Sequence, residues 1–171
     1  MENISIRKSD LGDVSNLTVL KQQVWIATYA VEGIRTEFSD YVLSEFTTEN
    51  IRKSIQDSNK LIYIAEIDKH IIGCVEIDFN AKCPVETKTG PEIAVLYILE
   101  RFIGMGIGKI LLDKSILFCK EMDFKTVWLT VYYKNERAIN FYVKNRFKEA
   151  GNTYFEMGGN RYENKVMVRK I

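Results

Sequence analysis

Apolar residues recur along the chain at two spacings, one typical of strands and the other of helices. Ile4 and Ile6 alternate with polar residues and predict a short strand. Ser9 and Asp10 follow as capping residues, and the next apolar positions share one helical face: Leu11, Val14, Leu17, Val24 and Trp25. The acidic and aromatic segment over 30–50 predicts a short helix between loops.

The middle of the chain alternates between strand-like and polar stretches. After a helix predicted near 49–58, two runs rich in β-branched residues cover 61–67 and 71–79. The short polar segment Asp68–His70 lies between them, and this arrangement predicts a hairpin. A polar loop that contains a proline is expected over 80–90.

The second half of the chain begins with a strand, a helix and a strand. The nearly continuous apolar run 92–99 predicts a buried strand, 105–122 has helical spacing, and 125–132 returns to a strand pattern. Such a crossover predicts parallel neighbours. One helix and two strands are expected at the end, over 135–145, 147–155 and 162–169. The order β-α-α-β-β-β-α-β-α-β-β predicts an α/β fold with a mixed central β-sheet flanked by helices on both faces.

The length and the charge balance of the chain limit the classes of protein to which it can belong. A chain of 171 residues is long enough for a proper core, and we expect a single domain over 1–171. Lys and Arg total 24 against 23 Asp and Glu, so the charge balance gives no reason to expect nucleic acid or a membrane surface as a partner. The expected partner is therefore a small molecule.

The cysteines and the single histidine argue against several other classes. Cys74, Cys83 and Cys119 form neither a disulfide framework nor a zinc pattern, and they indicate reduced thiols in the cytoplasm. His70 lies in a polar turn, so a hydrolase triad or a histidine metal site has little to be built from. The residues from Met1 to Ser5 lack an apolar stretch and a cleavage site, so we expect no secretion signal, and the apolar runs stay below the roughly 18 residues that a membrane span needs. We expect a cytoplasmic protein without a metal.

A glycine-rich segment, Ile103–Lys109, gives the chain its sharpest local motif. It lies between a predicted strand and a predicted helix and contains three alternating glycines: Gly104, Gly106 and Gly108. Glycines let the backbone approach a ligand, and amides at a helix N-terminus favour an anion such as a pyrophosphate. The spacing excludes a Walker loop, which needs Gly at 103, and a dinucleotide fingerprint, which needs Gly at 109. A glycine-rich turn without a ligand stays open as the alternative.

This segment and the strand before it resemble the acetyl-CoA-binding motif of the GNAT superfamily, the Gcn5-related N-acetyltransferases. The similar residues are Leu96-Tyr97-Ile98 and Gly104-Met105-Gly106-Ile107-Gly108-Lys109. The resemblance implies a GNAT fold and acetyl-CoA as cosubstrate. Ile103 stands where the family has Gln or Arg, which leaves the backbone amides of the loop to hold the pyrophosphate.

A second block makes the resemblance more specific. Trp128-Leu129-Thr130-Val131, and the segment that follows from Asn135 to Tyr142, are similar to the family's next strand and helix. The resemblance implies that Asn135 and Ala138 contact the cofactor and that Tyr142 stands near its sulfur. Arg146 departs from the family, which has Gly there. A tyrosine on an amphipathic helix is also a common core residue, and this stays the alternative for Tyr142.

The resemblance extends over nearly the whole chain, and it is strongest to the bacterial spermidine/spermine N-acetyltransferases. The similar segments are Trp25-Ile26-Ala27-Thr28-Tyr29, Phe46-Thr47-Thr48-Glu49, Glu92-Ile93 and Phe155-Glu156-Met157-Gly158. It implies a primary amine of a polyamine as acceptor. Ala94 departs from that subfamily, which has a second acidic residue two places after Glu92.

Acidic and aromatic residues offer a pocket for a cationic substrate through charge pairing and cation–π contact. The candidate residues are Trp25, Tyr29, Glu37, Asp40 and Glu156. For each carboxylate alone, a solvated surface position is the alternative.

The chemistry requires a neutral amine, a polarised carbonyl and a proton for the departing thiolate. An alkyl amine with a pKa of about 10.4 is protonated at neutral pH, so a base or a water relay must collect its proton. Glu92 is the candidate base, with an exposed strand-start carboxylate as the alternative. The resemblance assigns carbonyl polarisation to the backbone amide near Ile98 and protonation of the thiolate to Tyr142.

Other functions stay open. The acceptor could instead be a protein N-terminus, an amino acid or an antibiotic, and a non-catalytic domain could bind acetyl-CoA as a sensor. A homodimer is among the assemblies that the sequence allows.

Overall fold

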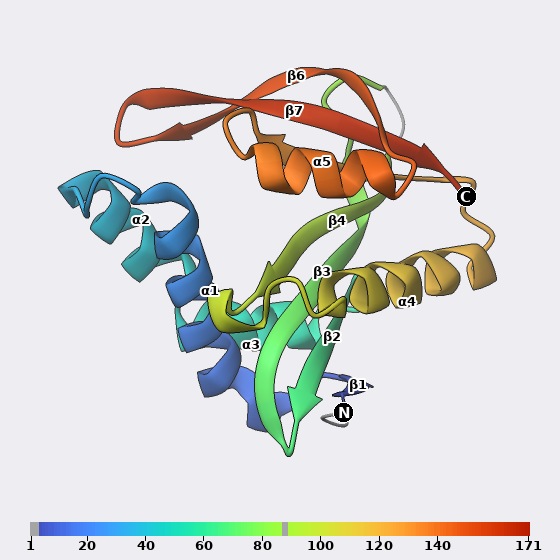
Figure 1. Cartoon of the computed structure of the whole chain (residues 1–171), viewed down its shortest axis with the longest axis horizontal. Helices are drawn as coiled ribbons and strands as arrows, with labels where there is room; N and C mark the ends of the chain where they lie inside the picture. Colours follow the sequence, from blue (N-terminus) through green and yellow to red (C-terminus); the bar gives the residue numbers. More distant parts are fainter. Residues whose placement is uncertain (1–3, 87–88) are drawn as a thin grey trace. The chain divides into compact units, whose positions relative to one another are not determined.

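The computed structural model describes residues 4–86 and 89–171, and within them the chain forms seven strands and five α-helices (Figure 1). The strands are β1 Ile4–Lys8, β2 Lys60–Ile67, β3 His70–Lys82, β4 Thr89–Ile98, β5 Thr126–Tyr132, β6 Lys148–Met157 and β7 Asn160–Lys170. The α-helices are α1 Val14–Tyr29, α2 Thr36–Glu45, α3 Thr48–Gln56, α4 Ile107–Glu121 and α5 Glu136–Lys144.

The strands form one mixed sheet in the order β1-β2-β3-β4-β5-β7-β6. β1 is antiparallel to β2, and β7 is antiparallel to both β5 and β6. β4 and β5 are parallel, with Glu92 opposite Trp128. The prediction of an α/β fold with a mixed sheet is therefore confirmed, as are the parallel neighbours expected from the crossover.

Several details differ from the sequence expectation. The three helices predicted before residue 60 are all present between β1 and β2, although the expected element order counted only two of them. The loop expected over 80–90 is shorter, because β3 continues to Lys82 and β4 begins at Thr89; residues 87–88 of that loop lie outside the described residues. Long-range pairing extends both strands beyond the point where the local apolar pattern ends.

The predicted cap before the first helix belongs to a 3-10 turn, Leu11–Asp13, that leads into α1. The N–H of Gly12 donates to Oδ1 of Asp10 over 2.7 Å, and the N–H of Asp10 donates to Oδ2 of Asp13 over 2.8 Å. This reciprocal pair is a capping box, so Asp10 is the capping residue and Ser9 is not.

Contacts within the chain divide it into two compact units. The first comprises Met1–Glu76 and Val95–Asp113, and the second comprises Ile77–Ala94 and Lys114–Ile171. β3, β4 and α4 each contribute residues to both units. The single domain expected over 1–171 stays a prediction.

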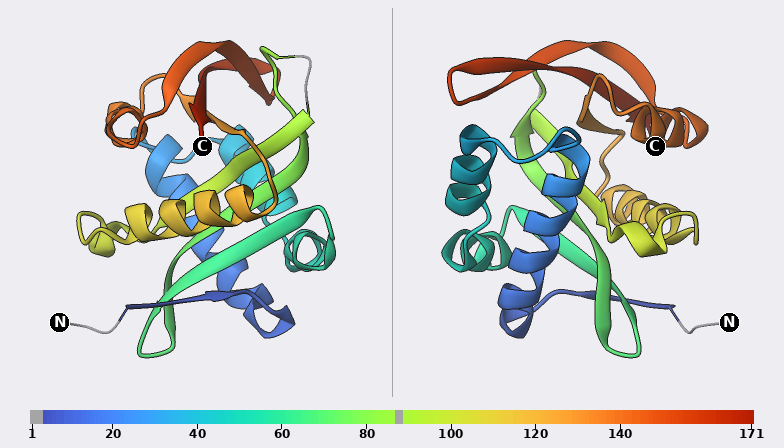
Figure 2. Two further views of the ribbon diagram at one scale, coloured as in Figure 1. Left: turned by 90° about the vertical axis from the view of Figure 1, so that its right-hand side faces the viewer. Right: turned by 60° about the vertical axis from the view of Figure 1, so that its left-hand side comes forward.

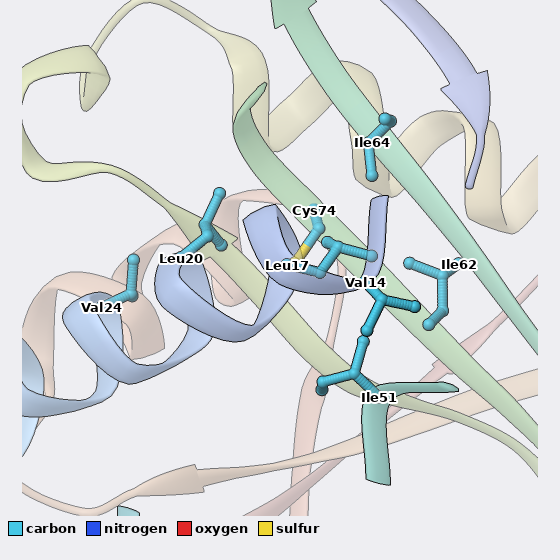
Figure 3. Packing of buried hydrophobic residues seen from close by; sticks show 8 residues of the cluster. All are labelled: Val14, Leu17, Leu20, Val24, Ile51, Ile62, Ile64 and Cys74. Atoms are coloured by element: carbon cyan, nitrogen blue, oxygen red, sulfur yellow. The ribbon is translucent and has the colours of Figure 1, made fainter. Parts of the chain in front are cut away.

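The core of the first unit forms where α1 and α3 meet the strands. Figure 3 shows Val14 and Leu17 of α1 near Ile62 of β2 and Cys74 of β3, with Ile51 of α3 beside them. Cys74 is fully buried, and burial raises the pKa of its thiol to about 12. Cys74, Cys83 and Cys119 are all buried with free thiols.

A buried ion cluster joins α1 to β3 inside this unit. Nζ of Lys21 donates to Oε2 of Glu76 over 2.5 Å, and Nζ of Lys60 donates to Oε1 over 3.2 Å. Burial alone would raise the pKa of the Glu76 carboxyl, but the two lysine charges and their hydrogen bonds outweigh it and lower the pKa. The cluster therefore fixes the position of α1 on the strand that precedes β4 in the sheet.

The second unit contains β5, β7 and β6 paired in that order, and Figure 2 shows the long hairpin formed by β6 and β7. Its buried residues include Cys83, Trp128 and Val166, which pack together across the strands. Phe147, just after α5, is also buried. Among the described residues of both units, every helix is too short or too polar to span a membrane.

Candidate active site

The glycine-rich loop holds two residues in the left-handed region of backbone conformation. Gly104 has φ +90° and Gly106 has φ +81°, and a Cβ added to either would meet no heavy atom within 4 Å. Gly73 of β3 differs, because its Cβ would lie 2.6 Å from Cδ1 of Ile98 and 2.9 Å from the carbonyl oxygen of Tyr97. Gly73 is required by packing, whereas the two loop glycines border open space that a ligand could enter.

The loop leads into the N-terminus of α4 and aims amides at that space. The N–H of Ile110 donates to the carbonyl of Gly106 over 3.1 Å, so Gly106 is the N-cap. The amides from Gly106 to Lys109 then have no acceptor within the helix, and this end carries the positive part of the helix dipole. Met105 contributes less, because its N–H reaches the carbonyl of Phe102 over 3.4 Å. This donor set suits the pyrophosphate of acetyl-CoA.

Buried apolar side chains hold the N-terminal turn of α4 in place. Ile107 and Leu111 are buried, while Ile103 and Met105 are exposed on the loop. Leu96, Tyr97 and Ile98 at the end of β4 are half-buried in the same unit. The first unit therefore contains both halves of the motif that resembles an acetyl-CoA site.

The second unit contains the residues of the other block. Asn135 caps α5, since its Oδ1 accepts a hydrogen bond from the N–H of Ala138 over 3.1 Å. A cofactor contact from the Asn135 side chain would therefore come from Nδ2. The role expected for Asn135 toward the cofactor stays a prediction, and capping explains why an Asn suits this position.

Tyr142 lies on α5 where the helix ends in a Schellman motif. The N–H of Phe147 donates to the carbonyl of Tyr142 over 3.0 Å, and the N–H of Arg146 donates to that of Val143 over 2.9 Å. Arg146 has φ +67°, so it adopts the conformation that suits Gly, the residue that the resemblance leads us to expect there. Tyr142 is 8% exposed, and its ring centroid lies 5.6 Å from that of Phe147.

Glu92, the candidate base, lies on β4 in the second unit. Glu92 is half-buried. This exposure favours neither the catalytic carboxylate nor the exposed surface carboxylate that the sequence left open. Nε1 of Trp128, its neighbour on β5, donates to the carbonyl of Gly90 over 3.3 Å. That hydrogen bond fixes the indole beside the strand on which Glu92 lies.

The first unit brings together the aromatic residues expected to bind the acceptor and adds others. The Trp25 ring centroid lies 4.7 Å from that of Tyr29, 5.5 Å from Phe38 and 5.0 Å from Tyr41. Trp25 is only 4% exposed and is the ring that contacts the other three. The end of α2 is tied to α1 because Nε2 of Gln22 donates to the carbonyl of Phe46 over 2.8 Å.

The three acidic candidates lie in different settings. Glu37 and Asp40 lie on α2, directly before Phe38 and Tyr41 of the aromatic cluster. Glu37 is 15% exposed at its side chain, while Asp40 is exposed. Glu156 lies on β6 in the second unit, is exposed, and is 3.6 Å from Nε of Arg161. Residues 4–86 and 89–171 hold no group of three His, Cys, Asp or Glu side chains that could bind a metal.

The sequence analysis did not identify one residue that contacts the aromatic cluster. Arg35 lies just before α2, and its guanidinium carbon is 4.6 Å from the ring centroid of Phe38. The only local signal was a basic residue next to the acidic and aromatic segment, and the ring contact depends on how the chain turns into α2.

Comparison with known proteins identifies the family. The sequence model of the acetyltransferase (GNAT) family matches residues 28–147. An uncharacterized N-acetyltransferase of Mycobacterium tuberculosis is 27% identical over 133 residues, covering 78% of this chain and 81% of its own length. The spermidine N(1)-acetyltransferase of Thermoplasma acidophilum is 26% identical over 152 residues, covering 85% of this chain and 89% of its own.

A solved structure shows the same fold. The PaiA N-acetyltransferase of Thermoplasma acidophilum, solved in complex with coenzyme A, has a TM-score of 0.78 at 23% identity, over 99% of both chains. The GNAT fold implied by the glycine loop and by the block from Trp128 to Tyr142 is therefore confirmed. Because the family match covers most of the sequence, the chain belongs to the acetyltransferase (GNAT) family.

Proposed function

We propose that this protein acetylates a terminal primary amine of a polyamine such as spermidine or spermine. Family membership makes it an N-acetyltransferase with acetyl-CoA as cosubstrate. The polyamine acceptor goes beyond what family membership implies. The similarity to a spermidine N(1)-acetyltransferase supports that acceptor. The proposal keeps the expectation of a cytoplasmic enzyme that acts on a small molecule.

We assign the phosphates of acetyl-CoA to the amides between Gly104 and Lys109. Two glycines with positive φ, open space beside them and the start of α4 support this assignment. Asn135 would add a contact from Nδ2, and Leu96 to Ile98 would bind the chain that carries the thioester through strand backbone groups.

The observation that carries the polyamine acceptor is the aromatic cluster with carboxylates on the adjacent helix. The ring centroids of Tyr29, Phe38 and Tyr41 lie within 5.5 Å of that of Trp25. Glu37 and Asp40 come from the same turns of α2 as Phe38 and Tyr41. Aromatic faces and carboxylates attract ammonium groups through the ring quadrupole and direct charge pairing. A polyamine carries distal ammonium groups for these contacts, whereas a short monoamine does not.

The reaction transfers the acetyl group by direct attack. The amine nitrogen forms a bond to the thioester carbonyl carbon, the carbon–sulfur bond breaks, and the electron pair leaves with sulfur. We assign the amine proton to Glu92, directly or through water, and the proton for the thiolate to the Tyr142 hydroxyl. The amide near Ile98 would bind the carbonyl oxygen as negative charge develops on it.

A panel of amines tests the proposal. The purified protein is incubated with acetyl-CoA and, in turn, spermidine, spermine, propylamine, lysine and a short peptide with a free N-terminus, while a thiol reagent measures released coenzyme A. We expect the highest kcat/KM with spermidine or spermine. A higher value with the peptide or lysine would move the protein to the corresponding alternative acceptor, and no turnover with any amine would favour a non-catalytic acetyl-CoA sensor.

A further inference from the structure

Arg35 occupies a fixed place at the start of α2. Its backbone carbonyl accepts hydrogen bonds from the N–H groups of Phe38 over 2.9 Å and Ser39 over 3.1 Å. These bonds set the direction of the chain without using the side chain. The guanidinium makes no hydrogen bond that caps α2, so its contacts need another explanation.

The contacts of the guanidinium include one with a carboxylate and one with a ring. Its Nη2 lies 3.0 Å from Oε1 of Glu37, and its central carbon lies 4.6 Å from the Phe38 ring centroid. Phe38 is buried and packs edge-on with Trp25, so this ring is part of the aromatic cluster. A carboxylate and an aromatic ring are the groups that we assign to a distal ammonium of the acceptor.

The exposure of the two partners differs in a way that favours exchange. The Glu37 side chain is 15% exposed, whereas that of Arg35 is 63% exposed. The Glu37 side chain is thus largely shielded from solvent, while the cation paired with it is open to solvent. Because the Arg35 side of the pair is open to solvent, water screens the interaction, and another cation can replace the guanidinium at a modest cost in free energy.

We propose that Arg35 is a specificity-determining residue whose guanidinium occupies the subsite for a distal ammonium of the acceptor. This inference rests on the proposed function. An acceptor that uses Glu37 must first displace Arg35, so the arginine lowers affinity for polyamines and leaves that for a short monoamine unchanged. The subsite accepts an alkylammonium group of a polyamine chain.

The test compares charge removal at this subsite with the same change elsewhere. Arg35→Gln removes the resident cation, and Arg52→Gln removes an exposed arginine of α3 as the matched control. Spermidine affinity is measured by calorimetry on the protein saturated with coenzyme A, and KM is measured for spermidine and propylamine. We expect Arg35→Gln to bind spermidine about fivefold more tightly, because the ammonium no longer has to displace a solvent-screened ion pair and a cation–π contact. Arg52→Gln should bind as the parent does.

A double substitution isolates the carboxylate. The gain from Arg35→Gln should disappear when Glu37→Gln is also present, because no carboxylate is then left to uncover. Arg35→Lys keeps the charge but not the planar fork, and its spermidine affinity should stay near that of the parent. Comparison of melting temperatures confirms that each variant is folded. If Arg35→Gln does not fold, Arg35→Ala removes the same charge and should show the same gain in spermidine affinity.

The outcomes separate this inference from the function on which it rests. Arg35→Gln could bind spermidine more tightly while neither the parent nor any variant acetylates it. That result would support the role of the Arg35 guanidinium in the subsite and overturn the polyamine as acceptor. Acetylation of spermidine with unchanged affinity in Arg35→Gln would overturn the inference and leave the function standing. An equal gain in Arg52→Gln, or a gain that survives Glu37→Gln, would also overturn it.

Discussion

Backbone conformation at single residues decides how the reactive groups are presented. Gly106 adopts φ +81° next to open space, and only a residue without Cβ does this without strain. Arg146 adopts φ +67°, which costs a residue with a Cβ about 1 kcal/mol. The Schellman hydrogen bonds and the contact between Phe147 and Tyr142 offset that cost. Both positions lie at helix ends that carry proposed site residues.

Gly106→Val should weaken acetyl-CoA binding. The substitution strains the loop and fills the space through which the phosphates would approach the amides of α4. We expect at least about a tenfold rise in the dissociation constant, which corresponds to roughly 1.4 kcal/mol. Isothermal titration calorimetry with acetyl-CoA measures the change.

Gly159→Val is the matched control for this loop. Gly159 has φ +77° and no heavy atom within 4 Å of an added Cβ, but it lies in the turn between β6 and β7. It therefore carries similar strain without the proposed ligand, and its acetyl-CoA affinity should match that of the parent. Unchanged affinity in a folded Gly106→Val protein would remove the phosphate site from this loop.

Tyr142→Phe should lower turnover far more than cofactor affinity. The ring and its packing on Phe147 are kept, and the lost hydroxyl matters mainly once the thiolate develops. A general acid typically contributes on the order of a hundredfold or more to kcat. Steady-state kinetics gives kcat, and calorimetry gives the acetyl-CoA dissociation constant.

Tyr154→Phe makes the same chemical change at an exposed position of β6 and should leave both quantities unchanged. If Tyr142→Phe turns over at the parent rate, Tyr142 is a packing residue of α5 and the thiolate takes its proton from another source.

At the scale of elements, sequence periodicity predicted most helices and strands because their apolar faces are regular. The hairpin around Asp68 and Lys69 was predicted from polar residues, and both adopt the positive φ that such a turn requires. The extension of β3 to Lys82 was not predicted, because strand pairing rather than local pattern holds its last residues. An element's end is decided by partners far away in the sequence.

The candidate site was predictable to the same extent. The glycine loop and the segment from Asn135 to Tyr142 have local signatures, and the structure gives each a defined helix end. The contact between Arg35 and Phe38 has no such signature, and neither has the ion cluster of Lys21 and Glu76. Both depend on which side chains the fold brings together.

Glu76→Gln should strongly destabilise the fold at neutral pH. It leaves Lys21 buried without a carboxylate, and breaking a buried ion pair typically costs about 3–5 kcal/mol. Chemical denaturation of parent and variant measures the difference in the free energy of unfolding. Glu49→Gln, which breaks the exposed pair with Lys53, is the control and should leave the unfolding midpoint unchanged.

The same pair predicts a pH dependence. Because the folded state lowers the pKa of Glu76, its stabilisation is complete above the ordinary glutamate pKa of about 4.3 and is lost as pH falls through the lower folded value. The stability difference between parent and Glu76→Gln should therefore be constant from pH 7 down to about 5 and shrink in stronger acid. A difference that stays constant into strong acid would contradict the lowered pKa.

At the scale of the whole molecule, the formal net charge is only +1, so no overall field draws in a polycation. Any attraction must come from local carboxylates such as Glu37 and Asp40. Charges near the surface are screened over about 8 Å at physiological ionic strength, and over about 3 Å at 1 M. Salt therefore distinguishes an acceptor held by several charge pairs from one held only at its reacting amine.

Raising the salt concentration should raise the KM for spermidine and leave the KM for propylamine nearly unchanged. We expect a rise on the order of threefold or more as the screening length shortens from about 8 Å to about 3 Å. Glu37→Gln and Asp40→Asn should raise the spermidine KM at low salt and flatten its salt dependence, because each removes one of the carboxylates being screened. Glu121→Gln, at the exposed end of α4, removes the same charge from a residue that is not part of the aromatic cluster and should follow the parent curve. Parallel salt curves for spermidine and propylamine in the parent would remove the polyamine from the proposal, while acetyl transfer to another amine would still follow from the family.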